Sequence, residues 1–220
     1  MTETKNNNLN QYIEHTLLKP YCTNEDIIKL CNEAIEHKFF GVCVPQYYVQ
    51  LAKKTLRKTD VKIITVVGFP FGYNTVSSKV EATKKAITGG AHEIDMVMNI
   101  AAFKNKDFAY VQNDIQSVVT ACHLSNKKCK VIIETCYLSN EEIALACKIC
   151  ADSEADFVKT STGYGTAGAT VEAVKIMRKS LPAKIKIKAS GGIKTKEFSL
   201  ALIEAGADRI GTSASIDIIS

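Results

Sequence analysis

The chain has 220 residues, of which 46% are hydrophobic and 23% are charged, and its formal net charge at pH 7 is +5. This is the usage of an ordinary globular protein, and the basic residues are scattered lysines rather than one block, so no nucleic-acid partner is expected. No apolar run approaches the roughly 20 residues that cross a bilayer, so we expect no membrane partner and a soluble, cytoplasmic protein.

Taken in chain order, short apolar strand patterns alternate with helical patterns. Residues 1–10 are polar and rich in asparagine, which predicts a frayed start or a poorly anchored helix. Strands are expected at residues 12–18, 41–45, 61–67, 93–98, 130–134, 157–159, 184–188 and 208–211. Helices are expected at residues 23–37, 46–58, 78–89, 107–123, 139–150, 170–179 and 195–204.

Some of these helices begin with a hydroxyl residue that is followed three positions later by an acidic one. The pairs are Thr23 with Asp26, Ser78 with Glu81, and Ser139 with Glu142. This spacing is typical of a capping box, in which each side chain binds the backbone N–H of the other residue. The pairs therefore predict where these helices start.

The alternation of strands and helices predicts the fold class. Eight expected strands that alternate with seven expected helices in about 220 residues match an α/β fold with a single (β/α)8 TIM barrel, in one domain over residues 1–220. A doubly wound open sheet is the alternative, but it usually has fewer strands.

An internal repeat supports the barrel. Residues 91–95, 155–159 and 207–211 share an alanine after a helix end, two further residues, an aliphatic residue and a distinctive last position. They would form the fourth, sixth and eighth strands, and alternate strands of a barrel fill the same interior layer. We therefore expect Asp95 and Lys159 to point inward at similar height, with Cys43 on the second strand sharing this direction. A common helix-to-strand turn is the other interpretation of the repeat.

Glycine-rich loops follow the last three expected strands. They are Gly163-Tyr164-Gly165, Gly191-Gly192 and Gly211-Thr212-Ser213. Barrel enzymes often bind phosphate in the loops after the last strands, where backbone N–H groups surround the anion. The three loops therefore predict one anion site. Lys194 lies just beyond, and we favour a solvated lysine at a helix start over a phosphate ligand.

Lys159 and Lys188 end neighbouring strands, and their ammonium groups would repel each other. With an ordinary pKa near 10.4, about one lysine in 2,500 is neutral at pH 7, and only the neutral amine attacks a carbonyl. Lowering the pKa to about 7 costs the ammonium form about 4.6 kcal/mol, which burial and a like charge can supply. Such a lysine is a Schiff-base nucleophile, with Asp95 as a proton relay through water. The bland alternative for Lys159 is a solvated lysine before a flexible loop.

The strand that carries Lys188 raises a question about Lys186. Lysines at 184, 186 and 188 alternate with isoleucines, so an inward Lys188 implies an inward Lys186. Either Lys186 is paired inside the barrel or the strand bends.

Eight cysteines are spread along the chain, and several lie in apolar helix or strand patterns. We expect reduced packing thiols rather than disulfides. The close pair Cys147 and Cys150 has the spacing of two helix neighbours, and no second pair or nearby histidine completes a metal site. No metal site is predicted.

Four motifs together resemble the deoxyribose-phosphate aldolase family. They are Phe157-Val-Lys-Thr-Ser-Thr-Gly163, Glu93-Ile-Asp95, Lys188-Ala-Ser-Gly-Gly-Ile193 and Tyr12-Ile-Glu-His-Thr-Leu-Leu-Lys-Pro20. The resemblance runs nearly the whole chain. It implies a class I aldolase that needs no metal or other cofactor and cleaves a small phosphorylated sugar, 2-deoxy-D-ribose 5-phosphate, to D-glyceraldehyde 3-phosphate and acetaldehyde. It also implies a homodimer.

By position, the resemblance implies that Lys159 forms the Schiff base, that Lys188 tunes its pKa and joins proton transfer, and that Asp95 moves the proton with water. The substrate contacts that it implies fall on Glu14, Thr16, Cys43, Thr160, Gly163, Tyr164, Gly165, Gly191, Gly192, Ile193, Gly211, Thr212 and Ser213. For Cys43, a small packing residue is the favoured interpretation.

The sequence departs from the family pattern at several positions. Glu14 stands where many relatives have aspartate, Tyr164 where some have lysine, and Ala214 where some have a second serine. The tyrosine-ended tail of some relatives does not follow Ser220, so proton transfer is expected to rely on water, Asp95 and Lys188.

Two other functions stay open from the sequence. Another Schiff-base aldolase or a transaldolase is one, although a keto-acid aldolase would need an arginine for the substrate carboxylate, and only Arg209 lies near a strand end. A non-catalytic sugar-phosphate-binding barrel is the other, although a pure binder has no need of an uncharged amine.

Overall fold

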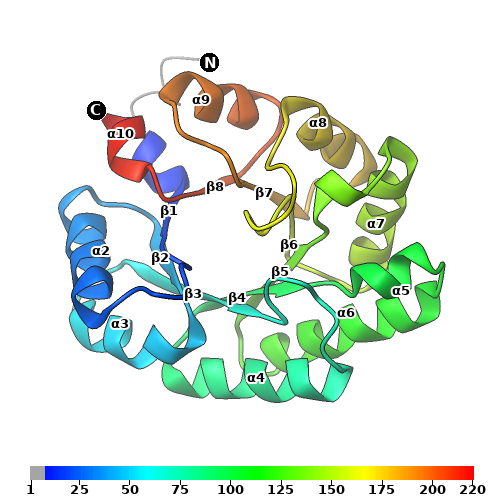
Figure 1. Cartoon of the computed structure of the whole chain (residues 1–220), viewed down its shortest axis with the longest axis horizontal. Coiled ribbons are helices and arrows are strands. Elements are labelled where there is room, and N and C mark those ends of the chain that lie inside the picture. The colour runs from blue at the N-terminus through cyan, green and yellow to red at the C-terminus, as the bar shows by residue number, and fades with distance from the viewer. Residues whose placement is uncertain (1–7) are drawn as a thin grey trace.

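The computed structural model describes residues 8–220 as a closed barrel of eight parallel strands in chain order (Figure 1). The strands are β1 Ile13–Thr16, β2 Gly41–Val44, β3 Lys62–Val67, β4 Glu93–Val97, β5 Lys128–Ile132, β6 Phe157–Lys159, β7 Lys186–Ser190 and β8 Arg209–Thr212. β8 pairs with β1 and closes the ring. The (β/α)8 prediction is confirmed.

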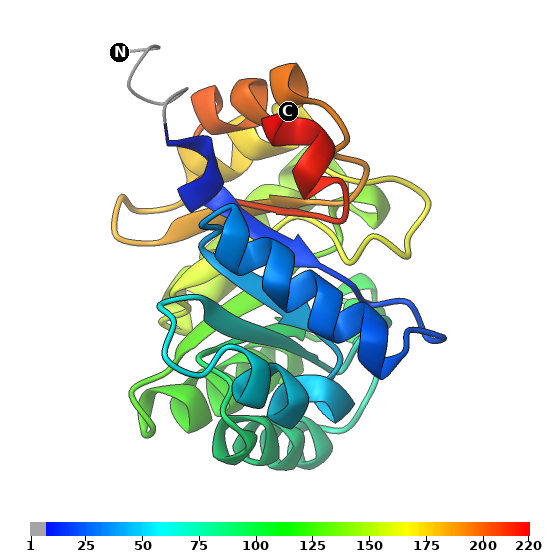
Figure 2. The ribbon, with the colours of Figure 1, turned by 90° about the vertical axis from the view of Figure 1, so that its left-hand side faces the viewer.

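Helices surround the strands on the outside of the ring, and Figure 2 shows α2 lying across the barrel wall. The α-helices are α2 Asn24–Glu36, α3 Val49–Thr55, α4 Val76–Gly89, α5 Ile100–Lys104, α6 Phe108–His123, α7 Asn140–Asp152, α8 Val171–Ser180, α9 Lys196–Glu204 and α10 Ser215–Ile219. The 3-10 helices are η1 Leu9–Tyr12, η2 Gln46–Tyr48 and η3 Thr135–Tyr137. Of the predicted frayed start, residues 1–7 lie outside the described residues.

Several boundaries differ from the sequence prediction. The predicted helix over residues 46–58 is divided into η2 and α3, while α5 and α10 were not predicted. Strand β7 begins and ends two residues later than predicted. The reason is that the alternation of lysine and isoleucine marks which residues share a face of the strand, whereas pairing with β6 and β8 decides which residues belong to the strand.

The caps of α2 and α7 are confirmed as capping boxes. The prediction for α4 is wrong, because Thr75 rather than Ser78 is the N-cap residue and its hydroxyl accepts a hydrogen bond from the Ser78 N–H at 3.3 Å. Glu81 instead lies one turn into the helix, 3.9 Å from Lys85. The helix therefore begins at Val76, before the expected position.

The main apolar core lies between the strands and the helices. Outward-facing strand residues such as Val44, Ile94 and Val158 pack with helix residues such as Leu30 and Val118, and all of these are buried. All residues of β2, β4, β6 and β8 are buried, as is usual for a parallel sheet covered on both faces.

All eight cysteines are free thiols, and every one except Cys136 is buried. Among residues 8–220, no helix is long and apolar enough to cross a membrane.

The Thr75 cap gives a direct test of where α4 begins. We predict that Thr75→Ala lowers the free energy of unfolding by about 1 kcal/mol, because the Ser78 N–H loses its acceptor. Glu81→Gln is the matched control and should change it by less than about 0.5 kcal/mol, since Glu81 is an exposed residue without a capping contact. Denaturant unfolding measures both, and a larger loss in the Glu81 variant would contradict the assignment.

Candidate active site

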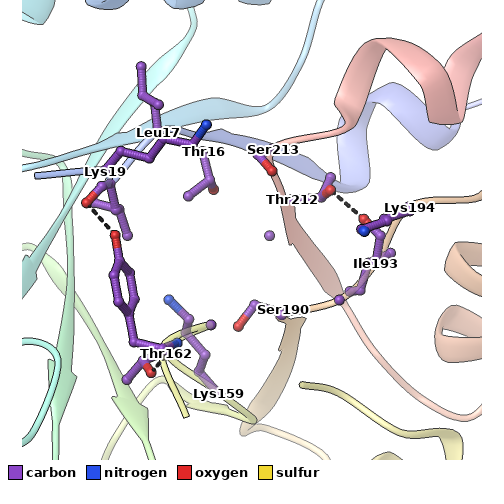
Figure 3. Close-up of a pocket in the computed structure, with 16 residues that line it drawn as sticks. Thr16, Leu17, Lys19, Lys159, Thr162, Ser190, Ile193, Lys194, Thr212 and Ser213 are labelled. Atoms are coloured by element: carbon purple, nitrogen blue, oxygen red, sulfur yellow. Dashed lines mark hydrogen bonds between the residues drawn. The ribbon is translucent and has the colours of Figure 1, made fainter. Parts of the chain in front are cut away.

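A cavity of about 320 Å3 opens at the carboxyl ends of β1, β6, β7 and β8. Active sites of (β/α)8 barrels lie at this end, in the loops that follow the strands. Figure 3 shows the labelled side chains in a ring around the opening, with Lys159 reaching in from one edge and Thr212 and Ser213 on the opposite side.

The structure brings most of the predicted substrate-binding residues to this cavity. Its lining includes Thr16, Lys159, Gly163, Tyr164, Gly191, Gly192, Ile193, Gly211, Thr212 and Ser213. The loops after β6, β7 and β8 therefore do converge, as the glycine pattern predicts.

The lining also holds residues that the sequence reasoning did not select as site residues. These are Leu17, Leu18, Lys19, Thr162, Ser190 and Lys194. The segment after β1 was a missed contribution, although Lys19-Pro20 closes a predicted strand and so had to lie at the same end of the barrel. Lys194 is exposed and lines the cavity, so it is both solvated and close to the predicted anion site.

Four predicted substrate contacts lie outside the cavity wall. Glu14, Cys43 and Thr160 are fully buried, and Gly165 lines a neighbouring cavity instead. The Thr160 hydroxyl accepts a hydrogen bond from the Ser190 N–H at 3.1 Å and so joins β6 to β7. Burial raises the pKa of the Cys43 thiol, which favours its packing role over chemistry.

Lys159 ends β6 and lies at the floor of the cavity with only 2% of its surface exposed. Its Nζ donates a hydrogen bond to Asp95 Oδ2 at 2.9 Å, so the two residues of the internal repeat meet inside the barrel. Burial lowers the pKa of Lys159, the Asp95 carboxylate opposes this change, and the nearby Lys188 cation adds to it. The net result is a pKa below that of an ordinary lysine.

Lys188 lies beside Lys159 and is fully buried beneath the cavity. Its Nζ donates to the same Asp95 oxygen at 2.7 Å and also to a Glu14 carboxylate oxygen. Burial alone would lower the pKa of Lys188, but the Asp95 and Glu14 carboxylates outweigh it and raise the pKa above the usual value. The two lysines therefore differ, with Lys188 held as an ammonium group and Lys159 as the more easily neutral amine.

Asp95 also binds a lysine that the sequence analysis did not select. Lys130 is fully buried on β5, opposite Asp95 in register, and donates to Asp95 Oδ1 at 2.9 Å. Burial alone would raise the pKa of Asp95, but Lys130, Lys159 and Lys188 together hold it well below the usual value. The carboxylate is therefore a fixed negative charge.

Lys186 resolves the question raised by the lysine alternation. It begins β7, is exposed, and its Nζ lies 5.9 Å from the centroid of the buried Phe157 ring. The strand keeps its alternation, and Lys186 reaches solvent at the amino end of the barrel. Neither of the two predicted outcomes, an internal partner or a bend, is needed.

The loops after β6 and β7 are joined closely. Ala169 N–H donates to the carbonyl groups of Ser190 and Gly191 at 3.1 and 3.0 Å. Gly191 has φ +85°, and a Cβ on Gly168 would lie 2.1 Å from the Gly191 carbonyl oxygen, so only glycine permits this approach. The contact fixes the positions of backbone N–H groups beside the cavity, where the cations Lys19 and Lys194 also lie.

Tyr164 spans the cavity mouth. Its hydroxyl donates to the Leu18 carbonyl at 2.7 Å, which joins the loop after β6 to the loop after β1. Its ring packs edge-on against Phe69, with centroids 5.4 Å apart. Because the hydroxyl is bonded to the Leu18 carbonyl, Tyr164 shapes the opening of the cavity.

Fold and cavity together define a TIM-barrel enzyme site, and comparisons with known proteins give the family. A family model described as DeoC/LacD family aldolase matches residues 7–216. A deoxyribose-phosphate aldolase of Thermococcus kodakarensis is 54% identical over 211 residues, covering 95% of this chain and 94% of that protein. A deoxyribose-phosphate aldolase of Treponema denticola is 49% identical over 212 residues, covering 96% and 98%.

A solved structure agrees with these sequence matches. The deoxyribose phosphate aldolase of Aeropyrum pernix, described as tetrameric, is 28% identical and superposes with a TM-score of 0.91, covering 97% of this chain and 90% of that one. The chain belongs to the DeoC/LacD aldolase family.

The difference between the two neighbouring lysines can be measured with an amine-selective reagent. We predict that Lys188→Met makes Lys159 react about tenfold or more slowly at neutral pH, because loss of the adjacent cation raises the pKa of Lys159. The slower reaction should recover at higher pH, where Lys159 deprotonates. Peptide mass spectrometry of the labelled protein follows the reaction.

Lys186→Met is the matched control, since it removes an inward lysine from the same strand at its exposed end. It should leave the pH profile of Lys159 unchanged. Identical profiles for the two variants would contradict the role given to Lys188.

Proposed function

We propose that this chain is a class I aldolase that reversibly cleaves 2-deoxy-D-ribose 5-phosphate to D-glyceraldehyde 3-phosphate and acetaldehyde. The observation that carries the proposal is Lys159, a buried amine of lowered pKa at the floor of a cavity whose other walls offer glycine-rich loops and two lysines. The substrate is inferred from the names of relatives, deoxyribose-phosphate aldolases that are about half identical over nearly the whole chain.

The reaction begins when the neutral Lys159 amine adds to the aldehyde carbon of the open-chain sugar to form a carbinolamine. The carbinolamine hydroxyl takes up one proton through water in the cavity and leaves as water. The resulting protonated imine accepts the electron pair of the bond between the second and third carbons as that bond breaks. The proton of the third-carbon hydroxyl passes to water, and the phosphorylated aldehyde leaves. The enamine then takes a proton on its terminal carbon, and water releases acetaldehyde and restores the amine.

Asp95 lies on the far side of the Lys159 nitrogen from the cavity, within 2.9 Å of it. Its carboxylate stabilises the positive charge of the imine and orients the nitrogen that carries it. Lys188, bound to the same oxygen, remains protonated and provides an ammonium proton beside the reacting nitrogen. Protons reach the substrate through water between these groups and the cavity.

The phosphate is proposed to bind in the glycine-rich loops that line the cavity. Its contacts would be the backbone of Gly163, Gly191, Gly192 and Gly211, and Ser213. Lys194 and Lys19 add positive charge at this rim. Arg209, which a keto-acid aldolase would need for a carboxylate, is buried beneath the cavity with its guanidinium carbon 3.2 Å from the Phe40 ring centroid. This placement favours a phosphorylated aldehyde over a keto acid.

Trapping with borohydride tests the proposed nucleophile. Reduction in the presence of acetaldehyde should leave one adduct, on the peptide that contains Lys159. We predict that Lys159→Leu abolishes both the adduct and turnover while the far-ultraviolet circular dichroism and the unfolding midpoint stay close to those of the parent protein. Retained turnover, or an adduct on another lysine, would refute the assignment.

Lys194 gives a test of the phosphate site. We predict that Lys194→Ala raises KM for the phosphorylated sugar about two- to fivefold, which is the effect of losing one exposed ion pair, with little change in kcat. KM for 2-deoxyribose, which lacks the phosphate, should stay the same. Lys196→Ala, two residues away and outside the cavity lining, is the control. Equal effects on both sugars would place the phosphate elsewhere.

A homodimer is proposed from the family resemblance, and the tetramer described for the Aeropyrum pernix protein is the alternative assembly. Light scattering distinguishes them: a particle of twice the 24.1 kDa chain mass supports the dimer, and four times that mass supports the tetramer.

A further inference from the structure

An ion-pair network fills the barrel interior beneath the cavity. Its members are Glu14, Glu93, Asp95, Lys130, Lys159, Lys188 and Arg209. All are buried, and they come from β1, β4, β5, β6, β7 and β8. A network of this size in a barrel core must balance its charges, since an uncompensated buried charge is strongly disfavoured.

Lys130 is the member with the most carboxylate partners. Its Nζ lies 2.6 Å from Glu93 Oε2, 2.9 Å from Asp95 Oδ1 and 3.4 Å from Glu14 Oε1. Lys188 shares two of these partners, Asp95 and Glu14. Lys130 therefore contacts every carboxylate of the network.

Lys159 and Arg209 lie at the edges of the network. Lys159 has one carboxylate partner, Asp95, and also faces the cavity. Arg209 Nη1 lies 3.9 Å from Glu14 Oε1, and its guanidinium group stacks on Phe40. Lys159 is therefore the basic side chain that is paired with one carboxylate and can release its proton into the cavity.

The charges balance only when Lys159 is neutral. Lys130, Lys188 and Arg209 are three cations, and they match the three carboxylates Glu14, Glu93 and Asp95. A protonated Lys159 adds an unmatched positive charge. The pKa directions agree, because carboxylates outweigh burial and raise the pKa of Lys130 and Lys188, whereas burial dominates and lowers the pKa of Lys159.

Two other titratable groups near Lys159 lie outside the ion-pair network. Cys43 faces it from β2, and burial raises the pKa of its thiol, so it is neutral. Glu134, after β5, accepts hydrogen bonds from the Thr162 backbone and hydroxyl, and within residues 8–220 it forms no ion pair with the network. Its carboxyl interacts with the Lys159 charge without direct contact, and burial raises the pKa of Glu134. Lys128 and Lys186 begin their strands at the solvent-exposed end.

We propose that Lys130 is a positioning residue that keeps Lys159 neutral without touching the substrate. Lys130 binds all three carboxylates and supplies the third positive charge that balances them. Without Lys130, a protonated Lys159 would have to supply that charge. The proposal rests on the proposed function, in which a neutral Lys159 attacks an aldehyde. It adds a residue on a neighbouring strand as a determinant of the pH at which that attack begins.

The test is the pH dependence of imine formation, followed by borohydride trapping of acetaldehyde on Lys159. In Lys130→Met, the three carboxylates are balanced by two cations, Lys188 and Arg209. Protonation of Lys159 then supplies the third positive charge. The rise of trapping with pH should move upward by about one pH unit or more, which is about tenfold slower trapping at neutral pH, and the full rate should return at alkaline pH. An unmoved profile with a lower plateau would mean a merely structural role and would overturn the proposal.

A charge-compensating variant separates charge from packing. Lys130→Met with Glu93→Gln removes one cation and one anion, so the profile should return toward that of the parent protein. Glu93→Gln alone leaves surplus positive charge and should move the profile to lower pH. The charge count would be contradicted if trapping in the double variant still rose at the higher pH of Lys130→Met. It would also be contradicted if trapping in Glu93→Gln did not rise at a lower pH than in the parent protein.

These variants also give an answer if Lys130→Met does not fold, because Glu93→Gln keeps Lys130 and the double variant restores neutrality. Failure of the underlying function looks different. If Lys159 is not the nucleophile, the parent protein itself traps no acetaldehyde there, whereas failure of the Lys130 proposal leaves parent trapping intact with unshifted variants.

Discussion

The interior of this barrel depends on one carboxylate shared by three amines. Asp95 binds Lys159 and Lys188 through one oxygen, at 2.9 and 2.7 Å, and Lys130 through the other, at 2.9 Å. Because the three lysines hold its pKa well below the usual value, Asp95 is a permanent charge around which the amines are ordered. The amines are not equivalent, since Lys130 and Lys188 have further carboxylate partners and Lys159 has no other within residues 8–220. This inequality is the basis on which Lys159 is proposed as the nucleophile.

The closed barrel is what makes this arrangement possible. Neighbouring strands hold Lys130 opposite Asp95 and Lys188 opposite Lys159, so the pairs are fixed by backbone register rather than by flexible loops. A buried ion network adds little stability by itself, because desolvation offsets its attraction. Stability comes instead from the apolar layer between strands and helices. The stabilising apolar core thus lies outside the strands, and the charged network that surrounds Lys159 lies inside them.

The sequence predicted the fold because alternation of strands and helices is a repeated signal, and it predicted the meeting of Asp95 and Lys159 because alternate strands share an interior layer. It did not reveal Lys130, since a lysine at the start of a strand resembles an exposed residue such as Lys186 until register shows its depth. The start of α4 was misplaced because Thr75 has Ser78, not an acidic residue, three positions later, and yet its hydroxyl caps the first turn. Contacts between distant segments, unlike periodicity, leave no local signal.

The most direct measurement is the titration of individual lysines by NMR of protein with isotope-labelled lysine side chains, assigned by single substitutions. We expect Lys159 to lose its proton below the ordinary lysine pKa and Lys188 to stay protonated above it. If Lys159 and Lys188 titrated together at the ordinary value, or in the reverse order, the central claim would be contradicted.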